Sequence, residues 1–85
     1  MARLKIRTQA DRIAEAWAAL RAERDRRLAE TDWIVIQAYE RGEPVPEAWA
    51  AYRQALRDLP AQLTDEQVLA WHEGRGSVPW PEVPS

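Results

Sequence analysis

The sequence predicts an all-α protein, a small three- to four-helix domain with an extended C-terminal tail that contains proline and tryptophan. Two observations lead to this prediction. Apolar residues recur at three- and four-residue spacing in several segments, which is the period of a helix. Glycine, proline and threonine then separate these segments, as residues that start or stop helices do. Because 85 residues form one domain at most, we expect an N-terminal arm over 1–8, helices over 9–73 and the tail over 74–85.

The first predicted helix covers residues 9–30. Thr8 is a suitable N-cap, with Asp11 three residues further on. The apolar face consists of Ile13, Trp17, Leu20 and Leu28, with the aliphatic stem of Arg24 filling the gap. On the polar face we expect three i,i+4 ion pairs, Arg21–Asp25, Glu23–Arg27 and Arg26–Glu30. Before this helix, residues 3–7 alternate basic and apolar side chains, which is typical of a frayed arm or of a strand added to a partner's sheet.

The segment 33–39 is ambiguous. Trp33, Ile34, Val35 and Ile36 include β-branched residues that favour a short buried strand. A helix over 32–41 is the better interpretation, because Thr31 or Asp32 can cap it and Gly42 stands where a helix C′ residue is expected. A single strand would also have no sheet to join.

Two further helices are predicted beyond the stiff connector 42–46. The first begins with Pro46 in its opening turn and stops at Pro60, and its apolar stripe consists of Trp49, Tyr52, Leu56 and Leu59. The second covers 65–73, starts at a capping box formed by Thr64 and Gln67, and stops at Gly74. In the tail, Trp80 stands between two prolines, and we expect it to dock onto the chain's own helices or onto another protein.

Composition and charge restrict the class of protein. There is no cysteine, and no apolar run reaches the ~18 residues of a membrane span. Residues 1–29 carry a net charge of +4 and residues 30–85 a net charge of −6, which could orient the chain against a partner or against its own copies. The arginine-rich run 21–27 contains Glu23 and Asp25, which argues against a phosphate-tracking stripe, so nucleic acid is a disfavoured partner.

Catalytic signals are weak. The one histidine, His72, stands next to Trp71. In a metal site its only nearby co-ligands would be carboxylates such as Glu66 or Glu73. No base is spaced to activate Ser77 or Ser85, and no glycine-rich phosphate loop occurs. We therefore expect no enzyme activity, no metal and no cofactor.

Aromatic side chains are the informative feature, with five Trp and two Tyr but no Phe. Most of them are expected in the core, and a few are expected to make a partner contact together with arginine, because Trp, Tyr and Arg dominate interface energetics. The candidate partner-binding residues are Trp33, Trp49, Tyr52, Arg53, Arg57 and Trp80.

Three segments resemble one protein family. Residues 23–33 (ERDRRLAETDW) resemble the R-x-x-R-L-L-A-x-[ST]-D-W signature of phage tail assembly chaperone proteins. Residues 49–60 (WAAYRQALRDLP) resemble their W-x-x-Y-R-x-x-L-R-D-[LI]-P signature, and the ending Trp80-Pro81-Glu82-Val83-Pro84 is similar to W-P-x-x-P. The chain departs from the pattern after Trp33, where Ile34-Val35-Ile36-Gln37 replaces a Thr-x-x-Pro-Asp turn, and residues 61–79 are longer than usual.

The resemblance implies a role in the assembly of a phage tail within the host bacterial cytoplasm. The implied partners are other tail proteins, such as the tape measure, the tail tip or a fibre. Two alternatives stay open at this stage: a structural tail or tail-fibre subunit retained in the virion as an oligomer, and a small regulatory or nucleic-acid-binding protein that uses the basic N-terminal third.

Overall fold

The computed structural model describes residues 6–85, and its regular structure in that range is helical throughout. Four α-helices follow one another: α1 (Gln9–Ala29), α2 (Asp32–Arg41), α3 (Glu47–Asp58) and α4 (Asp65–His72). A 3₁₀ turn, η1 (Leu59–Gln62), connects α3 to α4. The all-α prediction is confirmed; residues 3–5 of the alternating N-terminal segment lie outside the described residues.

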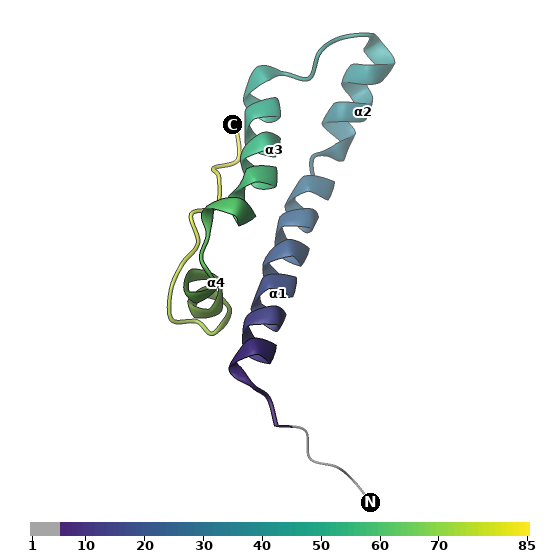
Figure 1. Cartoon of the computed structure of the whole chain (residues 1–85). Helices are drawn as coiled ribbons and strands as arrows, with labels where there is room; N and C mark the ends of the chain where they lie inside the picture. Colours follow the sequence, from purple (N-terminus) through teal and green to yellow (C-terminus); the bar gives the residue numbers. More distant parts are fainter. Residues whose placement is uncertain (1–5) are drawn as a thin grey trace, which may run out of the picture.

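The helices form an elongated hairpin (Figure 1). α2 continues beyond the end of α1 after a turn at Glu30 and Thr31, and α3 runs back beside them. α4 lies next to α1, and the tail then returns along α3 so that the C-terminus is beside that helix. The extents of the molecule are 60 × 30 × 19 Å.

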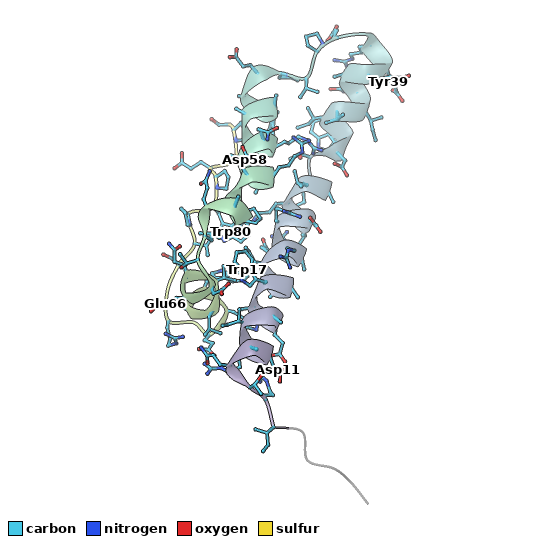
Figure 2. The ribbon with its side chains drawn as sticks, viewed as in Figure 1. Asp11, Trp17, Tyr39, Asp58, Glu66 and Trp80 are labelled. Carbon is cyan, nitrogen blue, oxygen red and sulfur yellow. The ribbon has the colours of Figure 1, made fainter. Side chains whose placement is uncertain are left out.

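The main core lies where α1, η1, α4 and the tail meet. Its buried residues are Ala16, Leu20, Leu59, Val68, Leu69 and Val78. Trp17 covers this core, and its indole N–H donates to the Asp65 carboxylate at 2.8 Å. Trp17 is half-buried, and this bond connects the first residue of α4 to the middle of α1; Figure 2 shows Trp17 on the side of α1 that faces α4.

The ambiguous segment after Thr31 is a helix, as predicted. Gly42 ends it with a left-handed backbone at φ 66°, which glycine adopts without steric cost. Ile34 and Ala38, one turn apart, are its buried residues. Thr31 occupies the N-cap position but makes no side-chain cap bond, because its hydroxyl donates instead to the Leu28 carbonyl at 2.9 Å.

Two proline predictions need correction. Pro46 is the N-cap of α3 with an extended backbone, and it is not part of the first turn. The α-helix does end just before Pro60, at Asp58, but Leu59 keeps a right-handed helical backbone. The chain continues as η1, with Pro60 in its opening turn, where the missing N–H is not required. The stripe on α3 is buried at Tyr52, Leu56 and Leu59, while Trp49 is half-buried.

Both predicted N-terminal caps are present. Thr8 with Asp11 and Thr64 with Gln67 form complete capping boxes at α1 and α4. Each box satisfies two backbone N–H groups that a helix start leaves unpaired. α4 ends at His72, and Gly74 follows with φ 75°.

Candidate partner-binding surface

Arg53 connects the three helices α1, α2 and α3. Its Nη1 donates to the Leu28 carbonyl at 2.9 Å and to the Thr31 hydroxyl at 2.6 Å, and it lies 3.1 Å from the Asp32 carboxylate. Its side chain is only 11% exposed. Arg53 therefore satisfies a carbonyl at the end of α1 and pairs with the first residue of α2, which makes it an internal link rather than a free contact.

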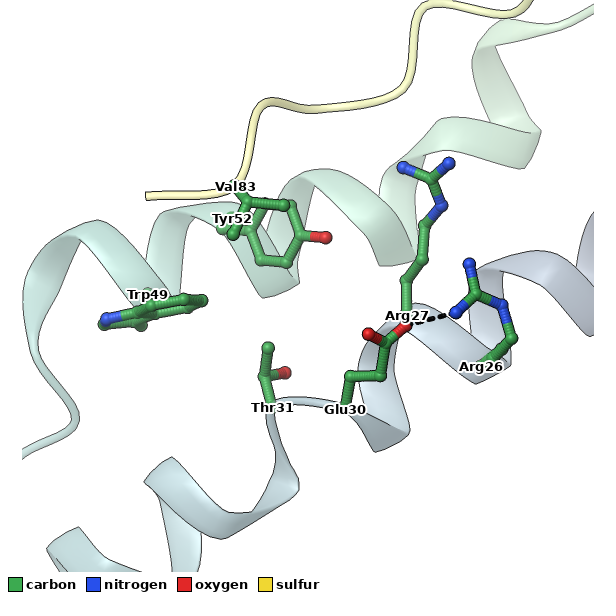
Figure 3. Close-up of a pocket in the computed structure, with 7 residues that line it drawn as sticks. All are labelled: Arg26, Arg27, Glu30, Thr31, Trp49, Tyr52 and Val83. Carbon is green, nitrogen blue, oxygen red and sulfur yellow. Dashed lines mark hydrogen bonds and ion pairs between the residues drawn. The ribbon is translucent and has the colours of Figure 1, made fainter. Parts of the chain in front are cut away.

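Trp49 and Tyr52 line a cleft of about 290 Å³ between α3, the end of α1 and the tail (Figure 3). Their rings are T-shaped with centroids 6.0 Å apart. The remaining lining residues are Arg26, Arg27, Glu30, Thr31 and Val83. Across the cleft, Arg26 and Glu30 form an ion pair at 2.5 Å, so one wall is apolar and the other is charged but internally paired.

Trp80 lies against the chain's own helices. The Arg27 guanidinium lies 4.3 Å from the centre of its ring, and Trp71 packs against it edge-on at 6.0 Å. A cation over an indole is stabilising by up to ~2 kcal/mol when water is excluded. The structure thus places Trp80 half-buried between α1 and α4, with no large exposed face.

Trp33 differs from the other candidates because it is 60% exposed. Ile36 at 57% and Tyr39 at 86% continue this apolar surface along α2, and Tyr39 points away from α3 (Figure 2). The sequence analysis did not include Ile36 and Tyr39 among the candidates. Trp33, Ile36 and Tyr39 are spaced three residues apart, which places them near one another on a helix. This spacing predicts an exposed surface only when it is known which face of α2 is covered.

The arginine-rich part of α1 is internally paired. Hydrogen bonds from Arg26 and Arg27, at 2.6 and 2.7 Å, lower the pKa of Glu23 from 4.5 to about 2. The hydrogen bond that Arg26 donates to Glu23 also raises the pKa of Arg26. The predicted pairs Glu23–Arg27 and Arg26–Glu30 are confirmed.

The predicted pair Arg21–Asp25 is wrong. Asp25 pairs with Arg24 at 3.1 Å, and Arg21 lies over the Trp17 ring at 5.5 Å from its centre. Arg21 is exposed, and its guanidinium lies over a ring that packs against the core, where the ring attracts the cation electrostatically.

Arg57 is exposed, and its guanidinium makes one long hydrogen bond, 3.4 Å, to Gln54 on its own helix. His72 is also exposed, and its ring lies 6.3 Å from that of Trp71. In the part of the chain that the structure describes, no group of three or more His, Cys, Asp or Glu could hold a metal ion. Over the same residues, no helix is both long and apolar enough to cross a bilayer.

The three segments that carry the family resemblance meet in space. The first signature forms the α1–α2 junction, the second forms α3, and Arg53 joins them. Arg27 of the first contacts Trp80 of the third. These contacts describe a class of protein: a small helical protein whose hairpin is held together by internal contacts. Among the described residues, α2 also presents an exposed apolar face.

The chain belongs to the phage tail assembly chaperone protein family, whose model matches residues 17–85. The match begins inside α1 and includes every contact described between the signatures. No curated protein and no solved structure in our comparisons matches the chain significantly.

Proposed function

We propose that this protein binds other phage tail proteins during virion assembly in the host bacterial cytoplasm and performs no catalysis. The observation that carries the proposal is the exposure of Trp33, Ile36 and Tyr39 on one helix. Exposed apolar patches rimmed by polar residues mark interaction sites in proteins that otherwise fold on their own. Membership of a tail assembly chaperone family indicates that the partner is a tail component.

The size of this surface favours reversible binding. Full burial of three large side chains contributes roughly 6 kcal/mol, and these three are already partly covered. Association costs at least several kcal/mol in lost freedom. This balance is below the ~8 kcal/mol that micromolar affinity requires, so these three side chains by themselves support only weak, reversible binding, which suits a protein that must release its partner when the tail assembles. We propose that the growing tail competes for the same partner, since the sequence has no nucleotide-binding loop to drive release.

Affinity purification from a phage-producing lysate tests this function. A tagged copy of the protein should retain a tail protein, such as the tape measure or a tail-tip protein, that mass spectrometry identifies. An unrelated tagged helical protein of similar charge is the control. Recovery of no tail protein above this control would contradict the proposal.

Mass spectrometry of purified virions separates a chaperone from a structural subunit. A chaperone should be absent or substoichiometric in the particle, whereas a subunit should be present in a fixed ratio to other tail proteins. A salt-dependent gel shift with random DNA would instead favour a nucleic-acid-binding protein, although Arg24, Arg26 and Arg27 of α1 are paired with Asp25, Glu23 and Glu30.

A further inference from the structure

The outward face of α2 has a regular geometry. At about 100° per residue, Ile36 points opposite the midpoint between Ile34 and Ala38, the buried residues of the helix. Trp33 and Tyr39 then lie about 60° to either side of Ile36. The exposed stripe is therefore centred on the side of α2 opposite its buried residues, and 57–86% of the surface of each of its three side chains remains exposed among the described residues.

The charges around this stripe have one sign. Viewed along the helix axis, Asp32 lies between Tyr39 and Ile36. Glu40 lies on the other side, between Ile36 and Trp33. Arg53 neutralises Asp32 in part, but Glu40 forms no ion pair with another described residue. Residues 30–47 contain five carboxylates and one arginine, a net charge of −4.

We propose that this face binds a basic amphipathic helix of a tail protein. The inference rests on the proposed function and specifies its surface and its partner chemistry. The slanting row of Trp33, Ile36 and Tyr39 is a ridge of residues three apart, which can pack against the apolar face of a second, amphipathic helix. Lysine or arginine beside the partner's apolar face would compensate Glu40 and the surrounding negative charge.

A second copy of the chain is a poorer occupant. A two-fold contact through this face would set two segments of charge −4 against each other. Docking of α1 from another copy would offer Arg24, Arg26 and Arg27, which are already paired with Asp25, Glu23 and Glu30. Arg21 lies over the Trp17 ring, and Arg12 pairs with Glu73. Charge complementarity therefore favours a different, basic polypeptide.

Model peptides test the proposal with the full-length protein. The probe is an 18-residue amphipathic helix of leucine and lysine. The first comparison peptide has the same pattern, with glutamate in place of lysine. The second has the same leucine and lysine composition in a scrambled order that removes the apolar face. Titration followed by ¹⁵N–¹H spectra should show the basic helix shifting resonances of α2, with at least tenfold weaker binding of both comparison peptides.

Variants locate the site. The double substitution Trp33→Ser/Tyr39→Ser should weaken binding at least tenfold, and Glu40→Lys should weaken it severalfold at low salt. The matched controls are Ile6→Ser, which removes an exposed apolar side chain ahead of α1, and Glu66→Lys, which reverses an exposed charge on α4. The controls should leave binding unchanged, and circular dichroism should show that all variants remain folded.

Equal binding of the acidic or scrambled peptide would overturn this inference, and so would an equal effect of the control variants. Concentration-dependent dimerisation abolished by Trp33→Ser/Tyr39→Ser would assign the face to a second copy instead. If a tail protein still co-purifies with that double variant, the proposed function stands and only this surface is wrong.

Discussion

At the residue scale, the side chain of Arg53 connects α3 to the junction of α1 and α2. One guanidinium nitrogen of Arg53 donates to the Leu28 carbonyl and to the hydroxyl of the buried Thr31, and so adds charge-assisted bonds to the bonds that Thr31 itself donates to Leu28. We expect Arg53→Ala to lower the free energy of unfolding by about 2 kcal/mol, because it leaves these acceptors and Asp32 without their charged partner. Urea denaturation measures this cost.

Arg57 provides the control for this substitution. It lies one turn further along α3 but is exposed and holds only a long bond to Gln54, so Arg57→Ala should change stability by less than about 0.5 kcal/mol. Equal costs for the two substitutions would show that Arg53 does not connect the helices in solution.

Glu23 makes stability depend on pH. Its pKa in the folded chain is about 2, below the ordinary 4.5, so the unfolded chain binds a proton more readily. The contribution of the Glu23 carboxylate to the free energy of unfolding is therefore fully present above about pH 4.5 and is lost as the pH falls towards about 2. The pKa of Glu73, lowered by hydrogen bonds from Arg12 and Arg75, acts in the same direction.

Substitution of Glu23 by glutamine tests this pH dependence. Glu23→Gln should cost on the order of 1 kcal/mol at neutral pH, the scale of a good surface pair. It should also flatten the curve of melting temperature against pH below about pH 4.5. Parallel curves for the variant and the parent chain would contradict the assigned role of the Arg26–Glu23–Arg27 cluster.

At the scale of elements, the left-handed residue that ends α2 sets how the chain turns into α3. Gly42 has φ 66°, and a Cβ placed there would meet no atom within 4 Å. Gly42→Ala should therefore cost about 1 kcal/mol from backbone strain alone, with no steric contribution. The melting temperature measures it, and a neutral or stabilising effect would mean that the connector adopts another backbone in solution.

The helices were predictable because their signals are local. Thr8, Thr64, Gly42 and Gly74 act through their own backbone, so their positions predict helix ends directly. The role of Arg53 was not predictable, because its partners Leu28 and Thr31 lie more than 20 residues away. The exposed face of α2 was only partly predictable: Trp33 was a candidate, but Ile36 and Tyr39 depend on which face α3 covers.

At the scale of the whole molecule, the chain is more extended than its length requires. Its radius of gyration is 17.0 Å, whereas a compact domain of this length has about 12 Å. The main core is concentrated around α1, η1, α4 and the tail. α2 lies outside it and buries only Ile34 and Ala38, so it has fewer apolar contacts to resist opening.

Native-state hydrogen exchange should reveal this difference. The open state through which the amides of α2 exchange should be at least tenfold more populated than the open state for the amides of α1 around Leu20. Leu20 is fully buried, and local stability follows apolar burial. The basic amphipathic peptide should slow exchange in α2 selectively, since a ligand that binds only the closed helix stabilises it by mass action. If α2 were as protected as the centre of α1 without a partner, its apolar face would already be covered in solution, and self-association would be the explanation to measure next.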